Sequence, residues 1–130
     1  MPSYPHRDMP VRVLVVDDHE PFRRAARAVV QEAPGFELVG EAADGEASIA
    51  AVQRLRPDLV LMDVSLPGIS GVEATRRIRA SAPSTVVLLL STRDALELVS
   101  EAASCGAAAY LPKSLLSPEH LGELWSAARG

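Results

Sequence analysis

Five short apolar stretches alternate with amphipathic stretches along the chain. Continuous apolar runs of this kind are typical of strands buried on both faces, as in a parallel sheet. Each run ends abruptly on polar or turn-forming residues, which sets the boundaries of the expected strands. The predicted strands cover about residues 11–17, 37–42, 59–62, 85–90 and 107–111.

Helix-start signals precede the amphipathic stretches. Pro21 lies in the expected first turn of the first helix, and Asp44 is a candidate N-cap of the second. Ser70 stands three residues before Glu73, which is the spacing of a capping box for the third. Helical periodicity predicts an inner face of Phe22, Ala25, Ala26, Val29 and Val30 on the first helix, of Ala47, Ala51 and Leu55 on the second, and of Leu121, Leu124, Trp125 and Ala128 on the fifth.

A fourth helix is expected over about residues 94–104, with Gly106 as its stop, and the fifth opens at Ser117-Pro118. Strict alternation of strands and helices predicts an α/β fold, a single doubly wound domain with helices on both faces of a parallel sheet. The proline-rich residues 1–10 are expected to be a flexible leader, which leaves residues 11–130 as one domain.

Polar side chains follow four of the five strands at their carboxyl ends. Asp17 and Asp18 follow the first strand, Asp63 the third, Ser91 the fourth and Lys113 the fifth. Because these strand ends line one crevice in a doubly wound sheet, the side chains are expected to converge. Crowded carboxylates suit Mg²⁺ or Mn²⁺, and a carboxylate beside such an ion is a competent nucleophile for phosphoryl transfer. The pattern therefore predicts a metal-and-phosphate site.

Composition narrows the classes of function. The chain has 130 residues, of which 48% are hydrophobic, and a formal net charge of −4. This size suits one domain, and the charge argues against a nucleic-acid surface within the chain. The single cysteine, Cys105, cannot form an internal disulfide, fits a reducing cytosol and is expected to be a small packed residue. No apolar stretch approaches the ~20 residues of a membrane span.

Several short motifs surround the expected site. They are Val15-Val16-Asp17-Asp18, Met62-Asp63-Val64-Ser65-Leu66-Pro67-Gly68, Gly71-Val72-Glu73, Leu90-Ser91 and Gly106-Ala107-Ala108-Ala109-Tyr110-Leu111-Pro112-Lys113. In order and spacing, these motifs resemble the receiver domain of two-component response regulators, a CheY-like family. The resemblance covers about residues 11–128 and implies a flavodoxin-like (βα)5 fold with strand order 2-1-3-4-5. The segments 17–22 and 36–42 are most similar to the subfamily with a NarL/LuxR-type helix-turn-helix output.

The resemblance implies a phosphoacceptor and its metal ligands. Asp63 would accept a phosphoryl group from a phosphohistidine on a sensor histidine kinase. Asp18 would bind Mg²⁺ (or Mn²⁺) directly and Asp17 mainly through water, with the backbone carbonyl of Ser65 as a further ligand. The only reactions implied for the chain are its own phosphorylation and dephosphorylation.

The resemblance also implies a switch. Lys113 would pair with the phosphoryl group, Ser91 would be the switch hydroxyl, and Tyr110 would be the aromatic that moves inward. Thr92 is the rival for the hydroxyl role, but the spacing of Ser91 to Tyr110 and Lys113 matches the family pattern. Ser114 stands where the family usually has a proline after a cis bond.

At the level of the whole protein, the resemblance implies a bacterial, cytoplasmic phosphorelay component that controls transcription through an output domain. Phosphorylation is expected to favour a homodimer.

Arg93, two residues past Ser91, is a charged neighbour expected to alter the rate of phosphate loss.

Three other classes of function are compared with this one. A flavin-binding module on the same fold needs a glycine- and hydroxyl-rich phosphate loop, whereas Asp17-Asp18 would repel phosphate without a metal. A phosphohydrolase needs a second acid two residues after the nucleophile, where this chain has Ser65. The remaining alternative is a stand-alone or degenerate receiver that acts only as a protein–protein interaction module.

Overall fold

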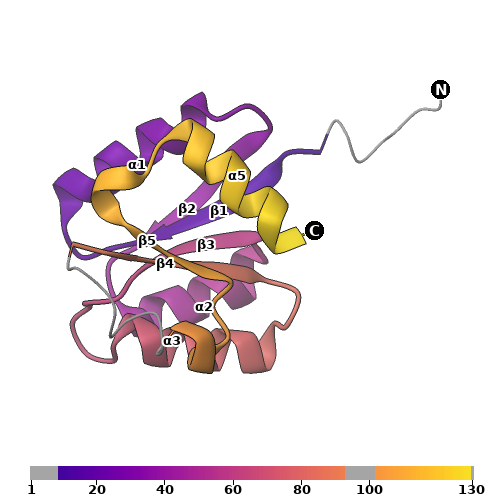
Figure 1. Ribbon diagram of the computed structural model, residues 1–130. Helices are drawn as coiled ribbons and strands as arrows, with labels where there is room; N and C mark the ends of the chain where they lie inside the picture. Colours follow the sequence, from indigo (N-terminus) through magenta and orange to yellow (C-terminus); the bar gives the residue numbers. More distant parts are fainter. Residues whose placement is uncertain (1–8, 93–101, 130) are drawn as a thin grey trace.

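Five parallel strands form the centre of the molecule in the order β2-β1-β3-β4-β5. The computed structural model describes residues 9–92 and 102–129 (Figure 1). The predicted doubly wound α/β fold and its strand order are therefore confirmed. The strands are β1 (Val11–Val16), β2 (Phe36–Ala42), β3 (Leu59–Asp63), β4 (Val86–Ser91) and β5 (Ala109–Pro112).

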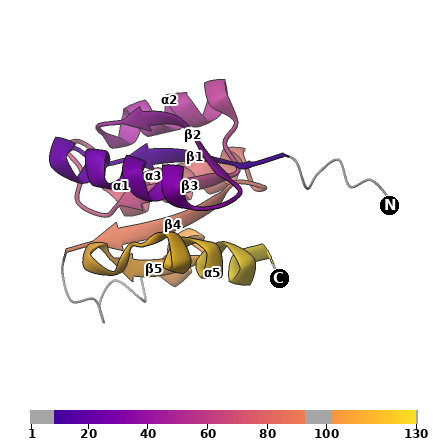
Figure 2. The ribbon, with the colours of Figure 1, turned by 90° about the horizontal axis from the view of Figure 1, so that it is seen from above.

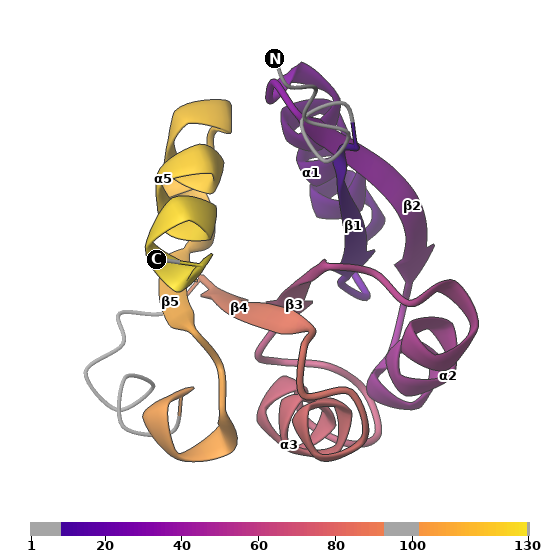
Figure 3. The same ribbon diagram turned by 90° about the vertical axis from the view of Figure 1, so that its right-hand side faces the viewer.

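Helices cover both faces of this sheet. The helices α1 (Glu20–Glu32) and α5 (Pro118–Arg129) lie on one face, and α2 (Gly45–Leu55) and α3 (Gly71–Ser81) lie on the other (Figures 1 and 3). Seen from above, α1 and α5 run side by side over the sheet (Figure 2). The carboxyl ends of the strands lie at one edge of the sheet (Figure 1), and the predicted acids and Lys113 stand at or directly after these ends in the sequence.

The central strands are apolar on both faces because each face carries a layer of helices. In β1, Leu14 and Val16 pack toward α2 and α3, whereas Val13 and Val15 pack toward α1 and α5. All five residues of β3 are buried as well. The continuous apolar runs of the sequence therefore correspond to strands between two cores.

The expected helix caps are confirmed in the structure. The Asp44 carboxylate accepts a hydrogen bond of 2.7 Å from the backbone N–H of Ala47, and the Ser70 hydroxyl accepts one of 3.0 Å from that of Glu73. Pro21 lies in the first turn of α1.

Two details of the predicted helix faces are wrong. Ala25 of α1 and Ala47 of α2 are exposed. In α2 the buried position is taken by Ser48, whose hydroxyl donates a hydrogen bond of 2.6 Å to the carbonyl of Gly45. That hydrogen bond gives a partner to the hydroxyl, which is the single polar group of the serine side chain, so Ser48 can occupy the apolar layer.

Two expected segments fall largely outside the described residues. The fourth helix, expected over residues 94–104, lies mainly outside them, although residues 102–105 are helical and Gly106 has a left-handed φ of +94°. Of the expected leader over residues 1–10, only residues 9 and 10 are described.

At the fifth strand the structure differs slightly from the prediction. The strand runs from Ala109 to Pro112, so it begins two residues later than expected. Lys113 then opens a short 3₁₀ helix that ends at Leu115, and the bond between Lys113 and Ser114 is trans. Cys105 is a buried free thiol, as expected of a packed residue.

Candidate functional site

Three carboxylates meet at the carboxyl edge of the sheet. Asp17 and Asp18 follow β1, and Asp63 is the last residue of β3. Because Val16 pairs with Met62 in the parallel ladder, the ends of the two strands lie next to each other. One oxygen from each of the three acids lies within 4.8 Å of the others; Asp17 and Asp63 are only 1% and 5% exposed, whereas Asp18 is exposed.

Lys113 reaches this cluster from the end of β5. Its Nζ lies 2.5 Å from Oδ2 of Asp17 and 3.5 Å from Oδ2 of Asp63. The same ammonium lies 4.4 Å from the centre of the Phe22 ring on α1, which is a cation–π distance. The lysine thus places one positive charge beside two buried negative ones.

Asp17 is held by its backbone and by one of its two carboxylate oxygens. Its N–H donates to the carbonyl of Ala42 at 3.0 Å, and its own carbonyl accepts from Arg23 at 2.6 Å. Its Oδ1 accepts a hydrogen bond of 2.8 Å from the backbone N–H of His19. Its Oδ2 is buried and pairs with the ammonium of Lys113.

Asp63 is fixed by the loop that follows it. Its Oδ1 accepts a hydrogen bond of 3.2 Å from the backbone N–H of Ser65. The N–H of Gly71, the first residue of α3, donates to the carbonyl of Val64 at 2.9 Å. The helix comes so close that a Cβ at Gly71 would lie 2.0 Å from the carbonyl oxygen of Asp63. Only glycine allows this approach between α3 and the end of β3.

The negative charge of the crowded carboxylates favours the binding of a cation. Burial, followed by the negative charge of Asp17, raises the pKa of Asp63, and the ammonium of Lys113 offsets this only in part. Asp17 is buried next to Asp63, so two buried acids share the single ammonium of Lys113. An all-oxygen donor set of this kind fits Mg²⁺ or Mn²⁺, which Asp17, Asp18 and Asp63 would hold.

The predicted switch residues lie on the neighbouring strands. Ser91 ends β4, is buried, and pairs with Pro112, so its backbone lies beside Lys113. Thr92, the rival hydroxyl, is exposed. Tyr110 on β5 is half-buried and packs against the core between the sheet and helices α2 and α3. Leu89, two residues before Ser91, belongs to the same core. Alternation along β4 therefore directs Ser91 toward the face that holds the tyrosine ring.

Some predicted features remain untested and some contacts were missed. The Ser65 carbonyl stays a predicted ligand, and Arg93 lies outside the described residues. Sequence reasoning placed Phe22 only in the core of α1, and it assigned no role to Arg23 or Glu41. The sequence did offer one indication of these contacts, because Phe22 and Arg23 lie within the first helical turn after Asp17 and Asp18.

Comparison with known families agrees with this geometry. The family profile of the response regulator receiver domain matches residues 13–124. The chain belongs to this family. The match contains every residue of the carboxylate cluster, the switch positions and Lys113.

Individual relatives of this receiver domain include regulators and one enzyme. The response regulator UvrY of Escherichia coli K12 is 36% identical over 120 residues, 92% of this chain and 55% of that protein. A protein-glutamate methylesterase/protein-glutamine glutaminase of Alkalilimnicola ehrlichii is 41% identical over 106 residues, 81% of this chain and 27% of the enzyme. The crystal structure of a two-component response regulator of the LuxR family from Aurantimonas sp. SI85-9A1 has a TM-score of 0.85 and 32% identity, covering 93% of this chain and 86% of that one.

The LuxR-family regulator among these relatives supports the resemblance to NarL/LuxR-type regulators. The chain spans 27% to 55% of the length of the curated relatives named above. Within its described residues, the receiver domain contains no helix that is long and apolar enough to cross a membrane.

Proposed function

We propose that this receiver domain is phosphorylated on Asp63 by a sensor histidine kinase, and that the phosphoryl group switches its surface to control an output domain or a partner protein. The observation that carries the proposal is the meeting of three carboxylates with the ammonium of Lys113 at one edge of the sheet. Acids alone would suit a structural cation site. The ammonium of Lys113 beside the buried acid adds a group that can bind phosphoryl oxygens.

The chemistry assigned to Asp63 is an in-line displacement at phosphorus. One carboxylate oxygen forms a bond to phosphorus while the bond from phosphorus to the imidazole nitrogen of the donor breaks, and the imidazole leaves. Lys113 is positioned to pair with the transferred phosphoryl oxygens. When bound, Mg²⁺ would neutralise charge on the carboxylates and on the phosphoryl group.

The chain is proposed to catalyse only its own phosphorylation and the slow loss of the phosphate. Ser65 stands two residues after the nucleophile, so no carboxylate at that position can act on a leaving group. The related methylesterase matches this chain over only 27% of its length, so its name does not assign esterase activity to the receiver.

The proposed switch involves Ser91 and Tyr110. The Ser91 hydroxyl would move toward the phosphoryl oxygens, and the ring of Tyr110 would follow on the same side of the sheet. The active arrangement would be sparsely populated beforehand, so that phosphorylation shifts an existing equilibrium. We expect the changed surface to favour a homodimer.

At the level of the whole protein, the proposal is a bacterial transcription regulator in the cytoplasm. Residues 1–10 would be a leader and residues 11–130 the receiver. The net charge of −4 supports DNA contact through an output domain only. The relative UvrY, of which the chain covers 55%, is named a response regulator, which supports this assignment.

Phosphorylation by acetyl phosphate and Mg²⁺ tests the central claim. Intact-mass measurement should show one phosphoryl group, stable in acid and labile in base. Asp63→Asn should abolish it, whereas the matched variant Asp44→Asn should keep it, because asparagine also caps a helix. A phosphoryl group that persists in Asp63→Asn would show that the nucleophile is misassigned.

A further inference from the structure

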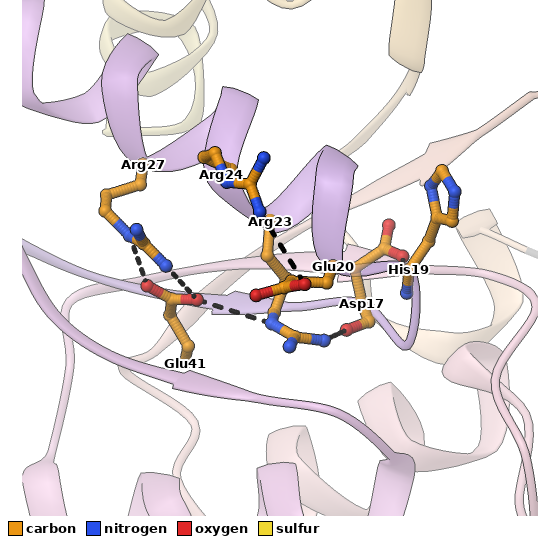
Figure 4. Close-up of polar contacts among 7 residues, drawn as sticks. All are labelled: Asp17, His19, Glu20, Arg23, Arg24, Arg27 and Glu41. Carbon is orange, nitrogen blue, oxygen red and sulfur yellow. Dashed lines mark hydrogen bonds and ion pairs between the residues drawn. The ribbon is translucent and has the colours of Figure 1, made fainter.

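Arg23 connects helix α1 to the backbone of the candidate site. Its Nη1 donates a hydrogen bond of 2.6 Å to the carbonyl oxygen of Asp17, and its Nε lies 3.3 Å from Oε1 of Glu41 on β2 (Figure 4). Arg27, one turn further along α1, binds the same carboxylate through Nε at 2.7 Å and Nη2 at 3.1 Å. These contacts run without a gap from Arg27 to the peptide group that follows Asp17.

The Asp17 carbonyl belongs to the peptide group that joins Asp17 to Asp18. A peptide group is planar, so fixing its carbonyl also fixes the direction in which the chain continues. The carboxylates on either side of this peptide have oxygens within 4.8 Å of each other and of Asp63. The hydrogen bond from Arg23 therefore restricts how these two carboxylates turn relative to each other.

We propose that Arg23 is a positioning residue for the divalent cation: it fixes the peptide between Asp17 and Asp18 so that both carboxylates face one ion. The inference rests on the proposed function, which supplies the ion. Arg23 and Glu41 are 20% and 21% exposed, so their pairing is less screened by solvent than that of a surface pair. Hydrogen bonds from Arg27 hold the pKa of Glu41 below its usual range, which keeps the carboxylate ionised.

The neighbouring Arg24 offers a matched comparison. Its Nη2 lies 3.6 Å from Oε1 of Glu20, four residues earlier on the same helix, and both side chains are 65% exposed. An exposed pair of this kind contributes little to stability, and among the described residues no contact links Arg24 to the site. Arg23 and Arg24 thus carry the same charge on the same helix, but only one of them touches the backbone beside the acids.

The test compares Mg²⁺ affinity among full-chain variants, measured from amide NMR shifts near residues 17, 18, 63 and 65. Arg23→Met should weaken Mg²⁺ binding by about tenfold or more, as loss of groups that orient metal ligands does. Arg24→Met should leave the dissociation constant unchanged. Arg23→Lys should give an intermediate loss, because an ammonium cannot bind the carbonyl and Glu41 in the same forked geometry.

Phosphorylation by acetyl phosphate supplies a second measurement. In Arg23→Met the half-saturating Mg²⁺ concentration should rise, while the rate at saturating Mg²⁺ should remain near that of the wild type. Asp63 and Lys113 are unchanged in the variant, so the loss is confined to occupancy of the ion. A role that is only structural would lower the melting temperature and leave the Mg²⁺ dissociation constant unchanged.

An unchanged Mg²⁺ dissociation constant in folded Arg23→Met, or an equal loss in Arg24→Met, would overturn the inference. Should Arg23→Met fail to fold, Arg23→Lys decides: weaker Mg²⁺ binding supports the inference, and unchanged binding overturns it. A wild-type chain that neither binds Mg²⁺ nor is phosphorylated would instead overturn the proposed function itself, so the two failures are distinguishable.

Discussion

Gly71 is the position where one added methyl group is expected to disturb the candidate site most directly. A Cβ there would lie 2.0 Å from the carbonyl oxygen of Asp63 and 2.9 Å from Cα of Val64. Real Cβ atoms essentially never make contacts below 3.0 Å, and both obstructing atoms are backbone, which cannot rotate away. Gly71→Ala therefore requires α3 or the end of β3 to move by about 1 Å.

The size of the effect follows from two opposing terms. Overpacking a close contact costs about 1–3 kcal/mol, and alanine offsets up to about 1 kcal/mol through its better helix propensity. We expect a net destabilisation of about 1–2 kcal/mol, which lowers the melting temperature by roughly 4–8 °C. A displacement of about 1 Å at the reacting carboxylate of Asp63 should also slow phosphorylation by up to about a hundredfold.

A second helical glycine supplies the control. Gly122 lies inside α5, and a Cβ there would meet nothing within 4 Å. Gly122→Ala should therefore stabilise the domain by about 0.5–1 kcal/mol and leave phosphorylation unchanged. Thermal unfolding and the rate of phosphorylation by acetyl phosphate check both variants. A Gly71→Ala variant with wild-type stability and rate would refute the close contact between α3 and the site.

Three further predictions concern pH and the switch. Burial and the charge of Asp17 raise the pKa of Asp63, so protons should compete with Mg²⁺ for this carboxylate at a higher pH than they would at an ordinary aspartate. Mg²⁺ titrations followed by NMR at several pH values would check this. The folded state favours the protonated form of Asp63, so this group contributes stability at low pH that is lost as the pH rises through its raised pKa. Without Mg²⁺, the melting temperature of Asp63→Asn should therefore exceed that of the wild type at pH 7 but not at low pH. Ser91→Ala should still be phosphorylated, yet ultracentrifugation with beryllofluoride should show no dimerisation, and Tyr110→Ala should likewise uncouple dimerisation without slowing phosphorylation.

The sheet and the location of the acids could be predicted from local patterns. A strand buried on both faces needs a continuous apolar run, and β1 and β3 both have one that ends on an aspartate. Alternation with helices makes the sheet parallel, and a parallel sheet brings its carboxyl ends to one edge. The proximity of Asp17 and Asp63 follows from these steps once the two strands are neighbours.

The remaining features depend on side-chain hydrogen bonds or on distances between elements, which hydrophobic periodicity does not contain. Ser48 is buried because its hydroxyl binds the carbonyl of Gly45, a contact that hydrophobic periodicity does not register. The pairing of Arg23 with Glu41 requires α1 to lie over the edge strand β2. Gly71 belongs to one of the motifs that carry the family resemblance, but its contact with the carbonyl of Asp63 depends on how closely α3 approaches the sheet.

The contacts around the site divide into two physical kinds. Asp17 is held by directional hydrogen bonds through its N–H, its carbonyl and Oδ1, so its position is narrowly fixed. The ammonium of Lys113 is held by ion pairs and by the face of Phe22, and neither interaction demands a single geometry. A site built in this way keeps its acids in place while its lysine can follow a newly bound phosphoryl group. That division matches what the proposed phosphorylation of Asp63 requires, because metal binding needs preorganised ligands and the response to phosphate needs a group that moves.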